Sequence, residues 1–370
     1  MMRPAVDLHA DRPREAANDD TQTLPCGALE KMPKWLICIP IVVQWCWLAL
    51  RYRSLTLPCA ANPAITSGGL VGEGKLEYFQ GMGLLARSFT ARHCAISTQR
   101  LKSPRELRRL MERAELSFPI VVKPDLGLCG HGVQRVDDLV GLQRYLAIFP
   151  PNEIVVMQEY LPQEGEAGIF YLRDPLTGRG RLTGLALRDF PRVIGDGRRT
   201  ITDLIKADPR ARRLLRSAQH DCQFTGSDVP AVGQVVRLAT IGSTRVGGLY
   251  RDGGACITPQ LTSAIDAIAR DMHSFHFGRF DVRFNTVQDL SAGVGFKIME
   301  INGAGSEAIE AWDPGTGVVA GFGIIFAKQR MLFAIGAKQR HAGVQPLGLL
   351  ALARLHRQQQ RLIAMYPPSN

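Results

Sequence analysis

Apolar and polar residues alternate along the chain with two periods, one typical of strands and one typical of helices. Apolar runs bounded by turn residues predict buried strands, and apolar residues three and four positions apart predict amphipathic helices. Ser103 followed by Glu106 predicts a capping box at the start of one helix. The predicted helices cover residues 75–82, 104–115, 137–147, 201–206 and 262–273, and the chain after residue 308 is also expected to be mostly helical. The predicted strands cover residues 119–125, 153–161, 179–192, 234–238, 245–250, 279–284 and 296–302, and this rhythm indicates an α/β or α+β fold.

The first 50 residues depart from this rhythm. Residues 1–30 are polar without an apolar period, and we predict a disordered tail that is not a signal peptide. Residues 35–50, WLICIPIVVQWCWLAL, are apolar at 14 of 16 positions and hold three of the four tryptophans. As a helix they would measure about 24 Å, less than the roughly 30 Å hydrocarbon core of a bilayer. A buried or interfacial helix is the preferred interpretation, and a membrane span is the alternative.

The overall charge favours an anionic partner. The chain has 45 Lys and Arg against 34 Asp and Glu, a net charge of +11, which suits a nucleotide, a nucleic acid or a membrane surface. A basic cluster at residues 198–216 has almost no aromatic residues between its arginines, so a solvated helix face is preferred and no nucleic-acid partner is predicted. The eight cysteines form no CxxC pair, which indicates a reduced, cytoplasmic protein without a zinc site.

The first chemical motif is FPIVVKPDLGLCGHGV at residues 118–133. A predicted strand delivers Lys123, and Gly127, Gly130 and Gly132 follow in a turn. Glycines let backbone N–H groups approach a phosphate, and the lysine adds a positive charge. A plain turn after a buried strand is the alternative.

The second motif, residues 154–172, is a buried strand that ends in Gln158, Glu159, Tyr160 and Leu161. A crossing between two lobes exposes backbone groups that can bind an adenine edge, and Glu166 beyond it could accept hydrogen bonds from ribose hydroxyls. A surface hairpin with charged residues is the alternative.

The third motif is a predicted hairpin that joins GRFDVRF to FKIMEIN within residues 278–302. Strand alternation places Arg279 and Asp281 on one face, and the turn between the strands brings Asp281 opposite Glu300, with Asn302 on the same face. Two carboxylates and an amide oxygen suit Mg²⁺ bound to nucleotide phosphates. A half-exposed hairpin with a charged, solvated face is the alternative.

Together these motifs resemble the ATP-grasp superfamily, in particular the D-alanine–D-alanine ligase-like and cyanophycin synthetase-like carboxylate–amine ligases. The segment VIGDGRRTITDLI at residues 193–205 resembles the Val-x-Gly-Asp-Gly-x-x-Thr segment of the cyanophycin and glutathione synthetase relatives, and the likeness covers about residues 70–330. The resemblance implies an α+β ATP-grasp fold in which two lobes clamp ATP. It also implies ATP-dependent ligation of a carboxylate to an amine through an acyl phosphate.

Site residues follow from the resemblance by position. Lys75, with Lys102 as the weaker candidate, and Lys123 with its glycines would hold the phosphates. Residues 158–161 and Glu166 would hold adenosine. The implied magnesium ligands are Asp281, Glu300 and Asn302, and the implied catalytic residues are Arg279, Asn302 and Arg192. Arg188 and the GDGRRT turn are open alternatives to Arg192 as the group that reaches the γ-phosphate. The sequence GAGSEA after Asn302 departs from the Thr-Ser-Pro-Gly run of D-alanine ligases, so D-alanine is not expected as the substrate.

The predicted organisation has five parts. They are a disordered tail at 1–30, a short N-terminal region at 31–102, a first lobe at 103–161, a second lobe at 162–335 and a helical C-terminal tail at 336–370. The predicted partners are a small carboxylate and an amine, such as an amino acid or peptide, with peripheral membrane contact through residues 35–50 left open. The alternative function is a non-catalytic, ATP-binding regulatory protein at a membrane.

Overall fold

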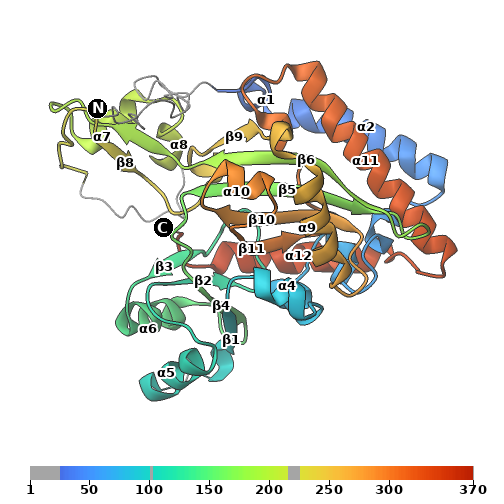
Figure 1. Ribbon diagram of the computed structural model, residues 1–370, viewed down its shortest axis with the longest axis horizontal. Helices are drawn as coiled ribbons and strands as arrows, with labels where there is room; N and C mark the ends of the chain where they lie inside the picture. Colours follow the sequence, from blue (N-terminus) through green and yellow to red (C-terminus); the bar gives the residue numbers. More distant parts are fainter. Residues whose placement is uncertain (1–25, 101–102, 216–225, 370) are drawn as a thin grey trace, which may run out of the picture.

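The computed structural model describes residues 26–100, 103–215 and 226–369, and within them the strands form three sheets (Figure 1). The strands are β1 (His93–Ser97), β2 (Ile120–Pro124), β3 (Gln134–Val136), β4 (Ile154–Glu159), β5 (Gly165–Arg173), β6 (Gly180–Asp189), β7 (Arg192–Ile194), β8 (Val235–Arg237), β9 (Leu249–Asp252), β10 (Phe277–Phe284) and β11 (Phe296–Asn302). Their orders are β1-β4-β2-β3, β11-β10-β5-β6-β9 and β7-β8. Every strand pairing in these sheets is antiparallel, and helices cover them, which confirms the predicted α+β class.

The helices pack on these sheets in separate groups. They are α1 (Ala28–Lys31), α2 (Lys34–Tyr52), α3 (Lys75–Gln80), α4 (Leu84–Phe89), α5 (Pro104–Arg113), α6 (Leu139–Ile148), α7 (Ile201–Ala207), α8 (Arg212–Leu215), α9 (Pro259–Arg270), α10 (Val287–Ser291), α11 (Val318–His341) and α12 (Leu349–Met365). The short 3-10 helices are η1 (Leu57–Ala60), η2 (Thr66–Gly69), η3 (Thr98–Arg100), η4 (Thr244–Val246), η5 (Gly254–Cys256) and η6 (Ile309–Trp312). The predicted capping box is present at α5, where the Ser103 hydroxyl accepts from the Glu106 amide.

The four-stranded sheet with α5, α6 and α12 forms the first lobe. Ile120 and Val122 of β2 are fully buried against Leu142 of α6, as the apolar alternation predicts. Leu362 of α12 and Tyr366 just after it join the same core. The last helix of the chain therefore belongs structurally to the first lobe.

The five-stranded sheet is the second lobe, and its two faces differ. Residues of one parity, such as Ile169 of β5 and Phe280 of β10, pack against α3, α4 and α9 in the largest apolar core. Residues of the other parity carry the charges, including Glu166 of β5 and Asp281 of β10, and both carboxylates are buried. The alternative interpretation of the hairpin, a half-exposed structure with a charged and solvated face, is therefore wrong.

The two-stranded sheet with α7 and α8 forms a small subdomain that has its own apolar core and lies at the upper left of Figure 1. The α1 segment is attached to it through Glu30, whose carboxylate contacts Arg210 Nη2 at 2.6 Å and Arg213 Nη1 at 3.0 Å. Leu29 is also buried. The predicted disordered tail at 1–30 is therefore wrong for residues 26–30, because an ion pair and an apolar contact bind them to the fold. Residues 1–25 lie outside the described residues.

The apolar segment 35–50 forms most of α2, which packs beside α11 (Figure 1). Trp45 meets Phe333 of α11 edge to face, with ring centroids 5.0 Å apart. Both helices are long and apolar enough to cross a membrane by length and composition, with 17% and 33% of their apolar windows buried inside the protein. Core helices of soluble proteins meet the same criterion, so this finding alone does not distinguish burial from membrane contact.

Three predicted boundaries change in the structure. The first lobe begins before residue 103, because β1 pairs with β4 in the lobe's sheet. The boundary at 335/336 falls inside α11, which continues to His341 and packs beside α2. The predicted strand at 245–250 is wrong in its first half, because Ser243 caps the turn of 3-10 helix η4 there and β9 starts only at Leu249.

Candidate active site

Two lysines and a glutamate from three separate parts of the chain meet at the junction of the lobes. Lys75 opens α3, Lys123 lies on β2 and Glu300 lies on β11. The Lys75 ammonium lies 3.3 Å from Glu300 Oε1 and donates to the Asp125 carbonyl. The Lys123 ammonium donates to Gln158 Oε1 at 2.7 Å and to the Met299 carbonyl at 3.0 Å. The structure thus brings together the two lysines predicted to bind phosphate and one predicted magnesium ligand.

Burial changes the acid–base behaviour of this group. Desolvation lowers the pKa of Lys123 to about 8, with Lys75 acting in the same direction and Glu300 opposing it. Burial would raise the pKa of Glu300, but Lys75 and Lys123 outweigh it, so its pKa stays below the usual value. Glu300 is therefore a carboxylate at neutral pH, and Lys123 is still mostly protonated there, although it loses its proton at a lower pH than an exposed lysine.

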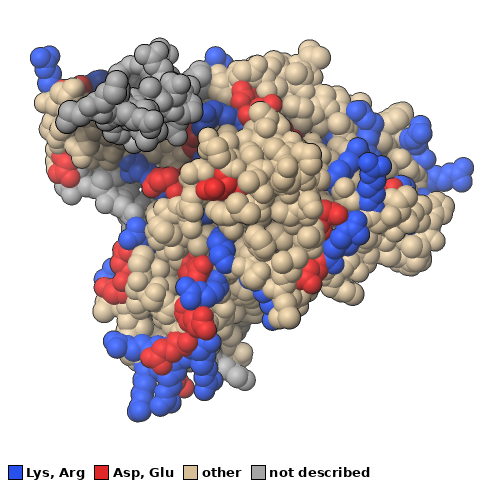
Figure 2. All heavy atoms as spheres, viewed as in Figure 1, with Lys and Arg blue, Asp and Glu red and all other residues tan. Residues whose placement is uncertain are grey.

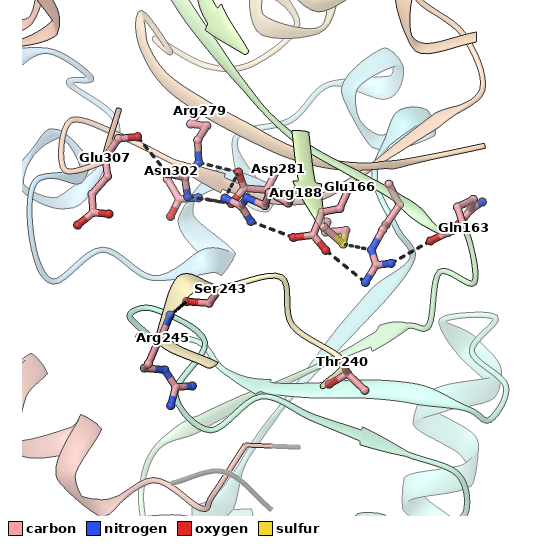
Figure 3. Close-up of polar contacts among 12 residues, drawn as sticks. Gln163, Glu166, Arg188, Thr240, Ser243, Arg245, Arg279, Asp281, Asn302 and Glu307 are labelled. Carbon is pink, nitrogen blue, oxygen red and sulfur yellow. Dashed lines mark hydrogen bonds and ion pairs between the residues drawn. The ribbon is translucent and has the colours of Figure 1, made fainter. Parts of the chain in front are cut away.

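A second group, drawn in Figure 3, surrounds Asp281. Arg188 Nη2 and Arg279 Nε donate to Asp281 Oδ1 at 3.0 and 2.6 Å. Arg279 Nη2 and Asn302 Nδ2 donate to Oδ2 at 2.9 and 3.1 Å. Burial would raise the pKa of Asp281, but the two arginines lower it further than burial raises it. Asp281 is therefore ionised and accepts four hydrogen bonds.

The same arginine network reaches Glu166. Arg188 Nη1 donates to Glu166 Oε1 at 3.0 Å, and Arg283 Nη2 lies 3.3 Å from Oε2 (Figure 3). Arg188 thus bridges two carboxylates, and their charges, with that of Tyr250, raise its pKa even though burial acts the other way. Glu166 was predicted to face ribose, and its carboxylate here is held by two guanidinium groups.

The backbone register explains how the hairpin forms this arrangement. Asp281 lies directly opposite Glu300, and Arg279 lies opposite Asn302, as strand alternation predicts. The register shifts after Asp281, so that Val282 faces Ile298 and Met299 is the extra residue. Strand alternation alone would place Met299 on the buried, apolar face with Ile301, and that expectation is wrong: Met299 is half-buried, and its sulfur contacts Arg283 Nε at 3.3 Å.

We call these nine residues the charged cluster: Lys75, Lys123, Glu166, Arg188, Arg279, Asp281, Arg283, Glu300 and Asn302. Its five bases exceed its three carboxylates by two charges. Partly or fully buried groups with an uncompensated charge favour a ligand of opposite sign. The cluster is therefore suited to bind an anion.

The predicted magnesium ligands are only partly suited to a metal ion as they stand. Two carboxylates and an amide are the hard oxygen donors that Mg²⁺ takes. Glu300 is the accessible member, with 34% of its side chain exposed. Asp281, in contrast, already accepts four hydrogen bonds, which is about as many as a carboxylate can accept. Within the described residues no group of three or more His, Cys, Asp or Glu lies close enough to hold a metal, so phosphate oxygens would have to complete the shell.

The glycine loop after β2 has the backbone shape that the sequence predicts. Gly130 and Gly132 have φ values of +74° and +72°, which residues with a side chain rarely adopt. Residues near the C-terminus donate hydrogen bonds to two carbonyls of this loop. Tyr366 Oη donates to the Leu126 carbonyl at 2.6 Å, and Ser369 Oγ donates to the Gly130 carbonyl at 2.7 Å.

A loop from the small subdomain lies across the front of the site. Arg245 Nε donates to the carbonyl of Cys129 in the glycine loop at 3.3 Å. A Cβ added at Gly242 would lie 3.3 Å from both Arg188 Cβ and Glu166 Oε1. Residues 240–248 therefore connect the glycine loop to the charged cluster. Sequence analysis missed this segment, although its sequence, TIGSTRVGG, combines three glycines with an arginine.

The predicted adenine segment is divided between two environments. Gln158 is buried and, besides accepting from Lys123, donates to the Met299 carbonyl at 3.2 Å. Glu159 instead forms an ion pair with Arg92, which draws its carboxylate toward solvent. The Arg135 guanidinium lies 4.6 Å from the centroid of the Tyr160 ring, and Leu161 is buried. Only Gln158 of the four contacts the charged cluster through these interactions.

Two other candidates lie elsewhere. Arg192 is on β7, opposite Arg237, in the two-stranded sheet of the small subdomain. The structure instead brings Arg188, which lies four residues earlier on β6, to Asp281. Lys102, the weaker phosphate candidate, lies outside the described residues. Sequence analysis also missed Glu73, which is half-buried and interacts electrostatically with Lys75 and Glu300, and whose pKa is raised to about 7 by desolvation.

The loop after Asn302 is shaped by close backbone contacts. Gly305 N donates to the Gly69 carbonyl at 2.6 Å, and Ala304 N donates to the Gly68 carbonyl at 3.1 Å. A Cβ on Gly303 would lie 2.7 Å from the Gly69 Cα, too close for a side chain. The sequence GAGS is therefore needed for the N-terminal region to close against the end of β11.

A cavity of about 670 Å³ lies away from the cluster. It is lined by residues at the β5–β6 turn and after α9, including Arg173, Asp174, Arg270, Asp271, His273 and His276. We place the candidate active site at the charged cluster, because the sequence-predicted residues meet there and not at this cavity.

The chain has distant structural likenesses but no sequence match. No protein-family model matches the sequence, and no curated protein matches it. It is similar to a bifunctional glutathione synthetase from Pasteurella multocida, with 15% identity, a TM-score of 0.36 and a match to 74% of this chain but only 38% of that enzyme.

It is also similar to D-alanine–D-alanine ligase from Bacillus anthracis, with 15% identity, a TM-score of 0.40 and coverage of 76% of this chain and 72% of that one. For the same ligase complexed with ATP, the identity is 14% and the TM-score is 0.40, and the match covers 73% of this chain and 68% of that one. These names fall within the group of enzymes that the sequence motifs resemble. At such identities and TM-scores the likenesses carry no argument about function, so the activity has to be inferred from the site itself.

Proposed function

We propose that this protein is an ATP-dependent carboxylate–amine ligase of the ATP-grasp type, with nucleotide bound between its first and second lobes. The observation that supports it most is the convergence of Lys75, Lys123 and Glu300 beside a glycine loop with φ-positive glycines. Cations, backbone N–H groups and a carboxylate from three chain segments form an arrangement suited to a nucleotide triphosphate. The net positive charge of the cluster supports the same ligand.

The roles of individual residues follow from their positions. Lys75 and Lys123 would neutralise phosphate oxygens, and Gln158 would orient the Lys123 ammonium through its 2.7 Å hydrogen bond. Arg279 would stabilise negative charge that develops on the carboxylate substrate, since its guanidinium lies beside Asn302 at the end of β11. Catalysis of this kind is mostly positioning and charge stabilisation, so no nucleophilic side chain is required.

Magnesium is part of the proposal. Glu300 and the Asn302 amide oxygen would hold it together with the phosphates, and Asp281 would support them through the arginine network. When bound, the metal neutralises charge on the phosphates and so assists transfer of the γ-phosphoryl group to a carboxylate. The carboxylate substrate then carries an acyl phosphate, and the amine displaces inorganic phosphate from it.

An isotope experiment tests this reaction directly. The full chain is incubated with Mg-ATP and a panel of amino acids and dipeptides whose carboxylates carry ¹⁸O. An acyl-phosphate route transfers one ¹⁸O from the carboxylate to inorganic phosphate, detected by mass spectrometry. Phosphate without the label, or phosphate released equally without an amine, would contradict ligation.

Matched variants locate the reaction at the cluster. Glu300→Gln should abolish phosphate release, whereas Lys297→Met should not. Lys297 lies on the same strand, and its ammonium donates to the Ser88 carbonyl and not to a residue of the cluster. Equal activity in the wild type and Glu300→Gln would contradict the proposed site.

One observation favours a second function. Asp281 already accepts four hydrogen bonds, from Arg188, Arg279 and Asn302, and so has no free oxygen lone pair for a metal ion. The positive charge beside it comes from arginines and not from a metal, which suits nucleotide binding without turnover. A non-catalytic ATP-binding regulatory protein would bind ATP with micromolar affinity in calorimetry and release no ADP with any amine. The label-transfer experiment separates the two functions.

A further inference from the structure

The outward face of α2 is apolar, whereas its polar residue points inward. Between Lys34 and Arg51, exposed residues recur at helical spacing along one face, and each of them is apolar: Trp35, Leu36, Cys38, Ile39, Val42, Val43, Cys46, Trp47 and Leu50. Trp35, Val43 and Leu50 are 66%, 63% and 79% exposed. A helix of a soluble protein shows the opposite pattern, with its polar residues toward water.

The inner side of α2 is fixed to the rest of the protein. Gln44 Nε2 donates to the Phe326 carbonyl of α11 at 2.9 Å, and Gln329 Nε2 of α11 donates to the Ile41 carbonyl at 3.3 Å. Leu48 and Ala49 pack against Leu57 and Phe333. Because one side is packed on protein, lipid could surround only the outer side, which excludes an isolated membrane span for this helix in the folded state.

The segments that form α2 and α11 contribute only positive charges, and the acids that pair with α11, Asp174 and Glu310, come from other parts of the chain. Residues 31–72 contain no Asp or Glu, and residues 314–370, which include α11, contain none either. The bases beside the apolar face are exposed at both ends of α2: Lys31, Lys34, Arg51 and Arg53. Figure 2 shows several Lys and Arg side chains, with fewer acidic ones among them, at the end of the molecule where Figure 1 places α2 and α11.

We infer that the outer face of α2 is a membrane-docking surface that lies in the plane of an anionic bilayer. The 19-residue helix is about 28 Å long, and its apolar face would enter the boundary between headgroups and acyl chains. The tryptophans near both ends suit the headgroup level, and the four terminal bases would contact anionic lipid. This surface is independent of the nucleotide site, so it would persist if the proposed ligase activity were wrong.

Vesicle binding by the full-length chain tests the docking surface. The protein should sediment with vesicles that contain phosphatidylglycerol about tenfold better than with phosphatidylcholine alone, and salt should reduce the difference. Fluorescence of the α2 tryptophans should shift to shorter wavelength and be quenched by lipids brominated in the acyl chains. Absence of binding to either vesicle would overturn the inference.

Paired variants distinguish lipid binding by this face from non-specific adsorption of the protein to vesicles. Val43→Glu with Trp47→Glu should abolish vesicle binding, while Val140→Glu, at an equally exposed valine of α6, should leave it unchanged. Lys31→Glu with Lys34→Glu should remove the preference for anionic lipid, and Arg105→Glu with Arg108→Glu on the exposed side of α5 should preserve it. Equal loss in both members of a pair would overturn the assignment to α2.

Two other occupants of this face are outcomes of the same experiments. Membrane-bound protein that alkaline carbonate fails to extract would show a span and overturn the in-plane position. A stable dimer in lipid-free solution that dissociates on Val43→Glu with Trp47→Glu would show that a second copy covers the face. Extraction by carbonate together with a monomer in solution supports docking on the bilayer surface.

Discussion

Glu166, Asp281 and Arg283 are between 2% and 5% exposed, whereas Trp35, Val43 and Leu50 of α2 are between 63% and 79% exposed. Both regions thus reverse the usual distribution of polar and apolar side chains, in opposite directions. In the charged cluster each buried group has partners within the chain, and the residual charge is positive. On α2 the exposed apolar groups leave a large apolar area open to solvent, and the Arg51 guanidinium, 5.6 Å from the centroid of the Trp47 ring, covers little of it.

The difference lies in what each region needs from outside. Ion pairs and hydrogen bonds compensate most of the burial of the cluster, so the fold tolerates it and a small anion completes it. The face of α2 is compensated only by a partner that removes a large apolar area from water. The cluster therefore fits a small charged ligand, and α2 fits an extended surface.

The largest effect expected from this comparison is on a buried ion pair that has no role in binding. Glu30→Gln leaves the Arg210 charge buried without its partner, which should lower the free energy of unfolding by about 3–5 kcal/mol. Chemical denaturation of the full chain measures this, with the exposed Glu112→Gln as a control that should change it by less than about 0.5 kcal/mol. A change below about 1 kcal/mol in Glu30→Gln would show that buried charges here contribute little to stability.

The cluster itself should respond in binding more than in stability. Lys123→Met removes a charged donor, which should weaken ATP binding roughly 10- to 100-fold, since such hydrogen bonds contribute about 1.5–3 kcal/mol. Its free energy of unfolding should fall by no more than about 1 kcal/mol, because burial already disfavours the charged amine. Calorimetry with ATP and denaturation measure the two quantities. Unchanged affinity with a large loss of stability would make Lys123 a structural residue.

The same lysine predicts a pH dependence of binding. Its pKa in the folded protein is lowered to about 8, so rising pH removes the charge that attracts phosphate. ATP affinity should fall as the pH rises through about 8, by at most about tenfold per pH unit for one group. In Lys123→Met this dependence should disappear. If it persists, Glu73, whose pKa is raised to about 7, is the next group to test by Glu73→Gln.

The smallest effect is expected for exposed residues of α2. Val43→Ser should alter the free energy of unfolding in lipid-free solution by less than about 0.5 kcal/mol, because the side chain loses little apolar contact on unfolding. Leu48→Ala, on the packed side of the same helix, should cost about 2–5 kcal/mol. Thermal or chemical denaturation compares the pair. Similar losses at both positions would mean that the outer face is covered within the protein.

The sequence predicted local and strictly alternating parts of the molecule well. Asp281 and Glu300 were expected to face each other because the two strands alternate strictly and only a short linker separates them, and they do. The bulge at Met299 and the short helix α10 within that linker were not predicted, since neither disturbs the apolar pattern. The convergence of Lys75 and Lys123 followed from the family resemblance and not from periodicity.

What the sequence did not predict depends on contacts between distant residues. Arg188 lies on a predicted strand, but its bridge between Glu166 and Asp281 requires β6, β5 and β10 to be neighbours. Glu30 was assigned to a disordered tail because its ion pairs to Arg210 and Arg213, about 180 residues away, leave no periodic pattern. Strand pairing and isolated long-range ion pairs are set by tertiary packing, which no local period encodes.

The glycine loop also determines when the nucleotide site can form during synthesis. Tyr366 and Ser369 bind loop carbonyls that precede them by 240 and 239 residues, and Gln359 binds one 232 residues before it. The sheet of the first lobe, residues 93–159, is therefore synthesised long before the segment that fixes its loop. A nascent chain would have both lobes available while its phosphate loop is still unsupported. Binding at the proposed nucleotide site would then require that residues 359–369 have left the ribosome.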